Sequence, residues 1–173
     1  MPVVNTKSTV ITNRDAVPRV ASNANIFNCQ LQEAVGVVEA ANNDSIGSKY
    51  FFATIPSNAR VSRILLSCDA ISTSGAMDVG LYQTTDNGGA VVEVDTFASA
   101  VVLTSALVHS DITHESDPTG SGATNYGIED QEKMVWQLLG LSSDPNRSYD
   151  VVGTVTTATG GAGTIALKIQ YVA

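Results

Sequence analysis

Apolar and polar residues alternate along much of the chain, with the two-residue period that places successive side chains on opposite faces of a β-strand. From residue 30 onward these stretches become regular, and turn-forming groups such as Asn42–Asp44 separate them. The pattern predicts strands over Gln30–Ala40, Lys49–Ile55, Arg60–Asp69 and Met77–Thr84. A polar tip at Thr85–Gly89 then predicts a hairpin loop.

The same alternation predicts which side chains face a core. In each strand one set of positions is apolar, while the intervening set is polar or small. The predicted core side chains are Leu31, Val35 and Val37 in the first strand, Val61, Ile64, Leu66 and Cys68 in the third, and Met77, Val79 and Leu81 in the fourth.

The second half of the chain holds two further strand signals and one helix signal. Tyr149–Thr157 and Gly163–Val172 flank the glycine-rich segment Gly160–Gly163, which predicts a terminal hairpin. Ile128–Leu139 has acids in its first turn, apolar residues on one face and a glycine after its end, so it predicts a helix. Thr96–Ser105 fits either a short helix or a strand.

The first 28 residues differ from the rest. Short β-prone fragments are separated there by Asn, Ser and Arg, with neither a helical period nor sustained alternation. Such a segment buries too little apolar area by itself to offset its ordering entropy. We therefore predict an extended N-terminal arm over residues 1–28 and one β domain over residues 29–173. Many short strands with one late helix indicate an all-β, antiparallel, jelly-roll-like sandwich.

Composition and charge narrow the classes of partner. Only 15% of the residues are charged, so fewer charges protect the surface against association. Residues 1–63 carry six basic and four acidic side chains, whereas the remainder carries three basic and thirteen acidic ones. A mildly basic front and an acidic body suit protein docking, and the net charge of −8 argues against nucleic acid. No apolar run suggests a membrane span or a signal peptide, so we expect synthesis in a cytoplasm.

The candidate catalytic and metal-binding signals are weak. His109 and His114 would point to opposite faces of a strand, so a metal site requires a tight turn between them. Gly160–Gly163 lacks the Lys-Ser/Thr of a phosphate loop, and Gly120-Ser121-Gly122 follows no strand as a nucleophile elbow would. Carboxylates such as Asp69 and Asp78 would serve a glycosidase if a hairpin brought them to face each other, but acids near strand ends are commonly solvated. We expect no enzymatic activity and no cofactor.

Cysteines and aromatic residues leave alternatives open. Cys29 and Cys68 are more consistent with free thiols than with a disulfide. Tyr50, Phe52 and Tyr82 would form a carbohydrate-binding face if exposed together, although most of the aromatic rings are expected in the core or in a subunit contact. Trp136 is a candidate for either the core or an interface anchor.

Several segments spread over the chain resemble the small capsid decoration, or cement, proteins of tailed bacteriophages. None of these segments is a catalytic fingerprint, so the likeness is one of overall sequence. The segments are Met1–Thr9, Ile55–Val61, Asp78–Tyr82, Phe97–Val101, Thr113–Ser116 and Trp136–Leu141.

The resemblance implies a jelly-roll-like protein that oligomerises, often as a trimer, on the outside of a virion and bridges major capsid protein subunits. It implies the capsid surface as location, while from the charge and the apolar pattern we expect neither nucleic acid nor a membrane as partner. We expect Lys7, Ile11, Arg14 and Arg19 of the arm, and the loop Asp117–Asn125, to contact partner proteins. The alternatives are a tail, neck or head-fibre subunit, and a carbohydrate-binding jelly roll.

Overall fold

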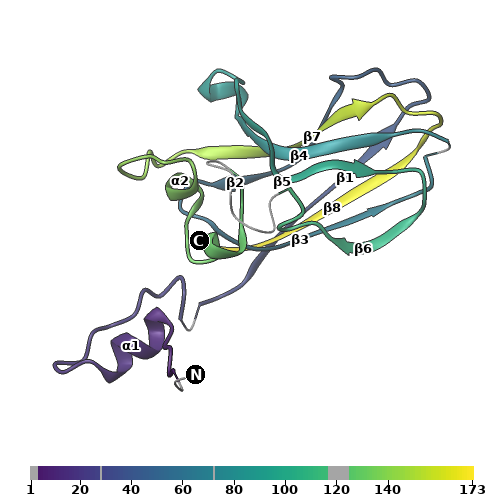
Figure 1. Cartoon of the computed structure of the whole chain (residues 1–173). Coiled ribbons are helices and arrows are strands. Elements are labelled where there is room, and N and C mark those ends of the chain that lie inside the picture. Colours follow the sequence, from purple (N-terminus) through teal and green to yellow (C-terminus); the bar gives the residue numbers. More distant parts are fainter. Residues whose placement is uncertain (1–3, 28, 72, 117–124) are drawn as a thin grey trace.

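The computed structural model describes residues 4–27, 29–71, 73–116 and 125–173. Within these ranges, eight strands form two four-stranded antiparallel sheets that face each other, and a small helical arm lies clear of them (Figure 1). The strands are β1 (Gln32–Ala40), β2 (Lys49–Pro56), β3 (Arg60–Cys68), β4 (Ala76–Gln83), β5 (Val91–Val102), β6 (Leu107–Asp111), β7 (Ser148–Thr157) and β8 (Gly163–Val172). The helical elements are α1 (Thr9–Asp15), η1 (Thr85–Asn87), η2 (Ile128–Asp130) and α2 (Val135–Leu138).

The strand order defines the architecture. One sheet has the order β1-β8-β3-β6 and the other the order β2-β7-β4-β5. Consecutive strands therefore alternate between the sheets, except for β4 and β5, which pair with each other. This is the arrangement of a jelly roll, in which strands wind between two packed sheets. The predicted all-β, antiparallel, jelly-roll-like sandwich is confirmed.

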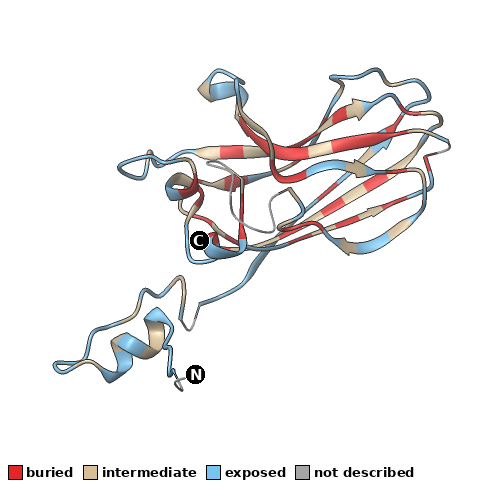
Figure 2. Ribbon diagram, in the orientation of Figure 1, coloured by how far each residue is buried: buried red, intermediate tan, exposed pale blue. Residues whose placement is uncertain are grey.

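The core lies between the sheets and follows the alternation of the strands (Figure 2). Ile64 and Leu66 of β3 have no exposed surface, nor do Ile165, Leu167 and Ile169 of β8. The predicted core positions of β3 and β4 are confirmed, from Val61 to Cys68 and from Met77 to Leu81. Burial of such side chains, each about 1.5–3 kcal/mol for a full Val, Leu or Ile, is the main force that holds the two sheets together.

The prediction for the first strand is wrong, because β1 presents its other face to the core. Leu31, Val35 and Val37 are 53%, 55% and 61% exposed, while Gly36 and Ala40 are buried. The reason is the close approach of β2: a Cβ built on Gly36 would lie 2.0 Å from the carbonyl oxygen of Phe52. Only the face with small residues lets the two backbones meet, so the valines point outward.

The predicted terminal hairpin is also wrong. β7 belongs to the sheet with β2 and β4, and β8 belongs to the sheet with β1 and β3. The glycine-rich segment between them crosses from one sheet to the other, and Gly160 N–H donates to the carbonyl of Ser74. Sequence alternation locates strands, but it does not show whether neighbours in sequence pair or face each other across a core.

The helix predicted over Ile128–Leu139 is broken into η2 and α2, and this prediction is wrong in extent. Met134, between them, has extended backbone angles. The N–H groups of Val135 and Trp136 donate to the carbonyl oxygens of Ala59 (2.8 Å) and Ser57 (3.0 Å), which belong to the β2–β3 turn. These contacts satisfy backbone groups that a continuous helix would have paired internally.

The β4–β5 region tests two other predictions. Thr96–Ser105 is largely strand, within β5, which decides between the two alternatives. The predicted hairpin loop at Thr85–Gly89 is confirmed, with η1 inside it and Gly88 in the left-handed region at φ 100°. The loop predicted from Asp117 lies outside the described residues up to residue 124.

Tyr126 ties the segment before η2 to the core. Its hydroxyl donates to the carbonyl of Val61 at 2.6 Å, its ring meets Phe97 edge-on at 5.8 Å, and burial raises its pKa to about 12. We expect Tyr126→Phe to lower the free energy of unfolding by about 1–2 kcal/mol, because it leaves a buried carbonyl without its donor. Chemical denaturation measures the change. Tyr171→Phe is the control, because the Tyr171 hydroxyl makes no hydrogen bond to another described residue. An equal loss in both variants would contradict the role of the Tyr126 hydrogen bond.

Candidate protein-contact site

The two histidines have separate structural environments. His109, on β6, is exposed, and its backbone N–H donates to the Ser67 hydroxyl. His114 stacks on Tyr126 with ring centroids 4.9 Å apart, and its Nδ1 lies 2.8 Å from the Tyr126 carbonyl, to which it must donate. Within the described ranges no group of three or more His, Cys, Asp or Glu side chains is placed to hold a metal ion.

The carboxylates proposed as a pair have separate roles. Asp69 follows β3 in one sheet and accepts a hydrogen bond from the backbone N–H of Thr164 at 3.0 Å. Asp78 lies on β4 in the other sheet and accepts from the backbone N–H of Ala100 at 2.7 Å. Each carboxylate thus stabilises a backbone segment, and the two do not form the facing pair that glycoside hydrolysis requires.

A different carboxylate on β5 makes the stability of the domain depend on pH. Burial, together with a hydrogen bond and charge repulsion from Glu93, raises the pKa of Asp95. An acid with a raised folded-state pKa stabilises the fold below its unfolded value of about 4, and this stabilisation is lost as the pH rises through the folded-state value.

We therefore expect Asp95→Asn to raise the melting temperature at neutral pH. The expected gain in the free energy of unfolding is up to about 0.5 kcal/mol, the usual scale for substitutions outside the core. This gain should vanish near pH 3, where the carboxyl of Asp95 is protonated. The amide keeps a donor for Glu93 while removing the ionisation. Melting curves at several pH values measure the difference, and a gain that is constant with pH would contradict this cause.

The aromatic rings do not form the exposed face that carbohydrate binding would use. Tyr50, Phe52 and Tyr82 are 8%, 7% and 2% exposed, which confirms the core alternative for them. Trp136 is half-buried on α2, and its indole N–H is buried without a hydrogen-bond partner among the described residues. Cys29 is an exposed free thiol and Cys68 a buried one.

The arm, in contrast, presents side chains to solvent. The prediction of a wholly extended arm is wrong at Thr9–Asp15, which form α1. Ser8 is the N-cap: its hydroxyl accepts from the Ile11 N–H at 3.5 Å, and its carbonyl accepts from the Thr12 hydroxyl at 2.9 Å. The helix ends at Asp15, with Ala16 as its C-cap, and the chain then turns back beside it. No residue between 4 and 27 is buried.

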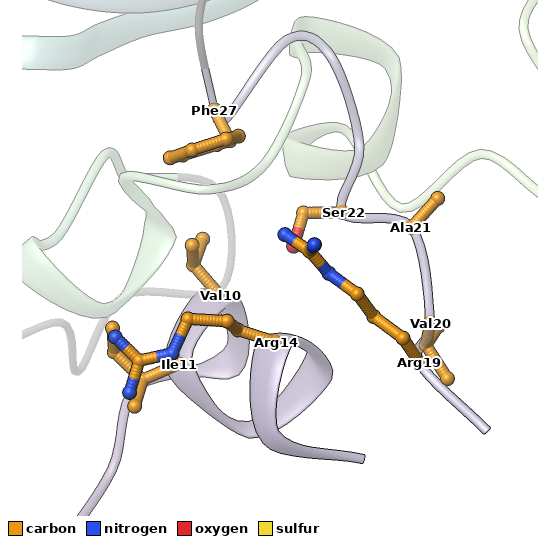
Figure 3. Close-up of a pocket in the computed structure, with 8 residues that line it drawn as sticks. All are labelled: Val10, Ile11, Arg14, Arg19, Val20, Ala21, Ser22 and Phe27. Carbon is orange, nitrogen blue, oxygen red and sulfur yellow. The ribbon is translucent and has the colours of Figure 1, made fainter. Parts of the chain in front are cut away.

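Between α1 and the returning segment lies a hollow of about 580 Å³, here called the arm hollow (Figure 3). Most of its lining is apolar, with arginine at two places. Figure 3 shows Phe27 on one side and the helix on the other, with residues 19–22 completing the wall. The lining residues are Val10, Ile11, Arg14, Arg19, Val20, Ala21, Ser22 and Phe27.

The predicted contact residues have different roles in the arm. Ile11, Arg14 and Arg19 line the arm hollow, and Lys7 does not. Lys7 and Arg14 both bind Asp15, each at 2.8 Å. The hydrogen bonds from Arg14 and Lys7 hold the pKa of Asp15 well below its usual range. They also offset the unfavourable position of an acid at a helix C-terminus.

Arg19 is the second arginine of the arm hollow, and its guanidinium is available to bind a partner. It is exposed, and no hydrogen bond or ion pair joins it to another described residue. The arm hollow therefore combines an apolar lining with one cation already paired and one free to meet an anion.

Arg60, at the start of β3, holds the base of the arm against the domain. Its Nε donates to the carbonyl of Asn25 at 2.7 Å, and its Nη1 donates to the carbonyl of Gln131 at 3.4 Å. A third contact joins its Nη2 to the Cys29 sulfur at 3.7 Å. One side chain thus links the arm, the start of β3 and the residue after η2, which fixes where the arm leaves the sandwich.

The sequence prediction missed Val20, Phe27 and Arg60 as parts of this site. Val20 and Phe27 are 50% and 57% exposed, and isolated apolar residues in a polar segment give no periodic signal. Arg60 opens a strand, where an arginine is usually a solvated end. Only the fold brings it to the arm.

Comparison with known proteins gives a structural likeness but no sequence relative. No protein-family model matches the chain, and no curated protein matches it. A chain of the cyanophage Pam1 capsid asymmetric unit is similar in structure, with a TM-score of 0.46, 12% sequence identity and coverage of 99% of both chains. That neighbour is a capsid component. In the described ranges no helix has the length and apolar character to cross a membrane.

Proposed function

We propose that this chain is a non-enzymatic capsid decoration protein of a tailed bacteriophage, which stabilises the head by bridging major capsid protein subunits. In this proposal residues 1–28 are a contact arm and residues 29–173 the domain that the arm serves. The protein is made in the host cytoplasm and acts on the capsid surface as a homo-oligomer, with a trimer as the expected form. Nucleic acid and membrane are not partners.

The observation that carries the proposal is the arm hollow. An apolar surface with an arginine at its edge stays open on a segment that buries none of its described residues. Exposed apolar surface of this kind marks protein contacts, because its exposure to water is unfavourable until a partner covers it. The sequence resemblance to decoration proteins and the jelly-roll fold agree with a structural role, although this fold also occurs in lectins.

The rival functions make different demands on the surface. A carbohydrate-binding jelly roll needs exposed rings, and the three candidate rings are buried. A tail, neck or head-fibre subunit would share the arm and the fold, so the partner particle decides between it and a decoration protein.

Co-sedimentation tests the proposal. The purified chain is mixed separately with phage heads that lack it and with isolated tails, and bound protein is measured in the pellet. We expect saturable binding to heads and none to tails. Binding to tails alone would favour the other virion subunit, and binding to neither would contradict the proposal.

A further inference from the structure

The outward face of β1 carries an apolar stripe. Val35 and Val37 are 55% and 61% exposed there, and Leu31 just before the strand is 53% exposed. On the paired strand β8, the small residue Ala166 lies opposite Val37, and Lys168, which pairs with Glu33, lies opposite Val35. We call Val35 and Val37 the β1 stripe. Two exposed valines on one face of the edge strand β1 are a surface that another protein segment can cover.

Acidic residues lie at both ends of the β1 stripe, and they differ in whether a cation pairs with them. Glu33 has partners on β8, with Lys168 Nζ at 3.5 Å and Gln170 Nε2 at 3.1 Å. Glu39 accepts a hydrogen bond from the Thr164 hydroxyl at 2.7 Å, and no cation among the described residues forms an ion pair with it. The stripe therefore has one carboxylate that is charge-neutralised and one that is not.

These charges argue against stacking two β1 stripes on each other. A two-fold arrangement of antiparallel strands centred on the valines would bring Glu33 of one copy towards Glu39 of the other. Like charges placed opposite each other across an interface disfavour that arrangement. A basic apolar partner fits the stripe better than its own copy does.

The arm hollow has the complementary features. Its lining is mostly apolar, like the β1 stripe. Its Arg19 has no hydrogen bond or ion pair with another described residue, and Glu39 beside the stripe has no ion-pair partner among them. Arg14 is already engaged with Asp15, just as Glu33 is engaged with Lys168. Among the described residues, the Arg19 guanidinium and the Glu39 carboxylate are thus the charged groups of the two surfaces that have no ion-pair partner.

The arm of the same chain does not make this contact. Arg60 holds Asn25 at the end of the sandwich, and α1 lies beyond that end, clear of both sheets (Figure 1). The arm projects towards solvent, where a neighbouring molecule can reach it.

We propose that the arm hollow of one copy receives the β1 stripe of a second copy, with Arg19 pairing with Glu39 across the contact. The inference rests on the proposed function in taking the arm as the contact element. The two surfaces are different, so the interface is heterologous, and copies joined in this way close into a ring when the rotation allows.

Charge reversal tests the pairing. Arg19→Glu and Glu39→Arg are each expected to weaken self-association of the purified chain about tenfold, as sedimentation equilibrium measures, because each places like charges together. The double variant carries both reversals on one chain and should regain most of the association. No loss in either single variant, or no recovery in the double variant, would overturn the pairing.

Disulfide trapping tests the contact itself. In a Cys29→Ser background, the Ile11→Cys chain is mixed with the Val37→Cys chain under mild oxidation. The two should form a mixed disulfide dimer. The matched control replaces Val37→Cys by Val102→Cys, a similarly exposed valine on β5 in the other sheet. Equal trapping with the control would overturn the docking site.

The two proposals fail separately. Self-association that is insensitive to the reversals, together with arm-dependent binding to heads, would overturn the arm-to-β1 contact and leave the decoration function standing. Self-association that follows the reversals, with no binding to heads, would overturn the decoration function and support the contact between copies.

Discussion

Replacing Gly36 by alanine is expected to lower the free energy of unfolding by about 3 kcal/mol or more, a large part of the stability of a domain of this size. The added Cβ would lie 2.0 Å from the Phe52 carbonyl oxygen and 2.5 Å from its carbon. Both atoms belong to the backbone of β2, so no side-chain rotation relieves the overlap. β1 must move away from β2, and the core beneath it opens. Thermal or chemical denaturation measures the loss.

Gly153→Ala is the matched control for this substitution. There the added Cβ would meet the sulfur of Met77 at 2.8 Å and the Phe52 ring at 3.0 Å. A methionine end is flexible and repacks, so we expect a smaller loss of about 1 kcal/mol. Equal losses in the two variants would contradict the idea that backbone approach at Gly36 sets the orientation of β1.

Placing a carboxylate in the arm hollow is the second large change. Ile11→Asp is expected to weaken binding of the chain to phage heads by on the order of a hundredfold, because the new carboxylate would lose its water against apolar contacts. The melting temperature of the domain should stay the same, since α1 contains no buried residue. A binding titration with phage heads and a melting curve measure the two effects.

Val17→Asp provides the control for the arm. Val17 lies in the same segment, is 97% exposed and does not line the arm hollow. It adds the same charge to the arm at a different place. If both variants lose binding equally, the arm acts through its net charge and the arm hollow has no specific role.

The fold was largely predictable because its strands alternate in a regular way. Val61 to Cys68 and Met77 to Leu81 face the core as their pattern indicates, since each strand has one clearly apolar face. β1 offered two plausible faces, one with valines and one with small residues. The choice depended on how near β2 comes at Gly36, which is a tertiary fact.

The other differences have the same origin. The helix predicted from Ile128 is interrupted because the β2–β3 turn binds the N–H groups of Val135 and Trp136. The terminal strands share a short glycine-rich connection that suits a hairpin and a sheet-to-sheet crossing equally well. In the arm, α1 forms through local contacts around Ser8 and Asp15, which are too short in range to give a periodic pattern.

The contact site was predictable in part. Arginines in a polar terminal segment pointed to docking, and Ile11, Arg14 and Arg19 do lie together around the arm hollow. Their role in binding stays a prediction. The involvement of Phe27 and the outward turn of Val35 and Val37 depend on the folded structure, so the sequence alone could not reveal them.

Removal of residues 2–20 tests the central claim most directly. This deletion takes away α1 and Arg19 and leaves Asn25 with its bond to Arg60. Melting curves first establish that the β domain is folded in both the truncated and the intact chain. The two chains are then compared by co-sedimentation with phage heads. We predict that the truncated chain melts as the intact chain does and no longer sediments with heads. A folded, truncated chain that still binds heads as tightly as the intact chain would contradict the account.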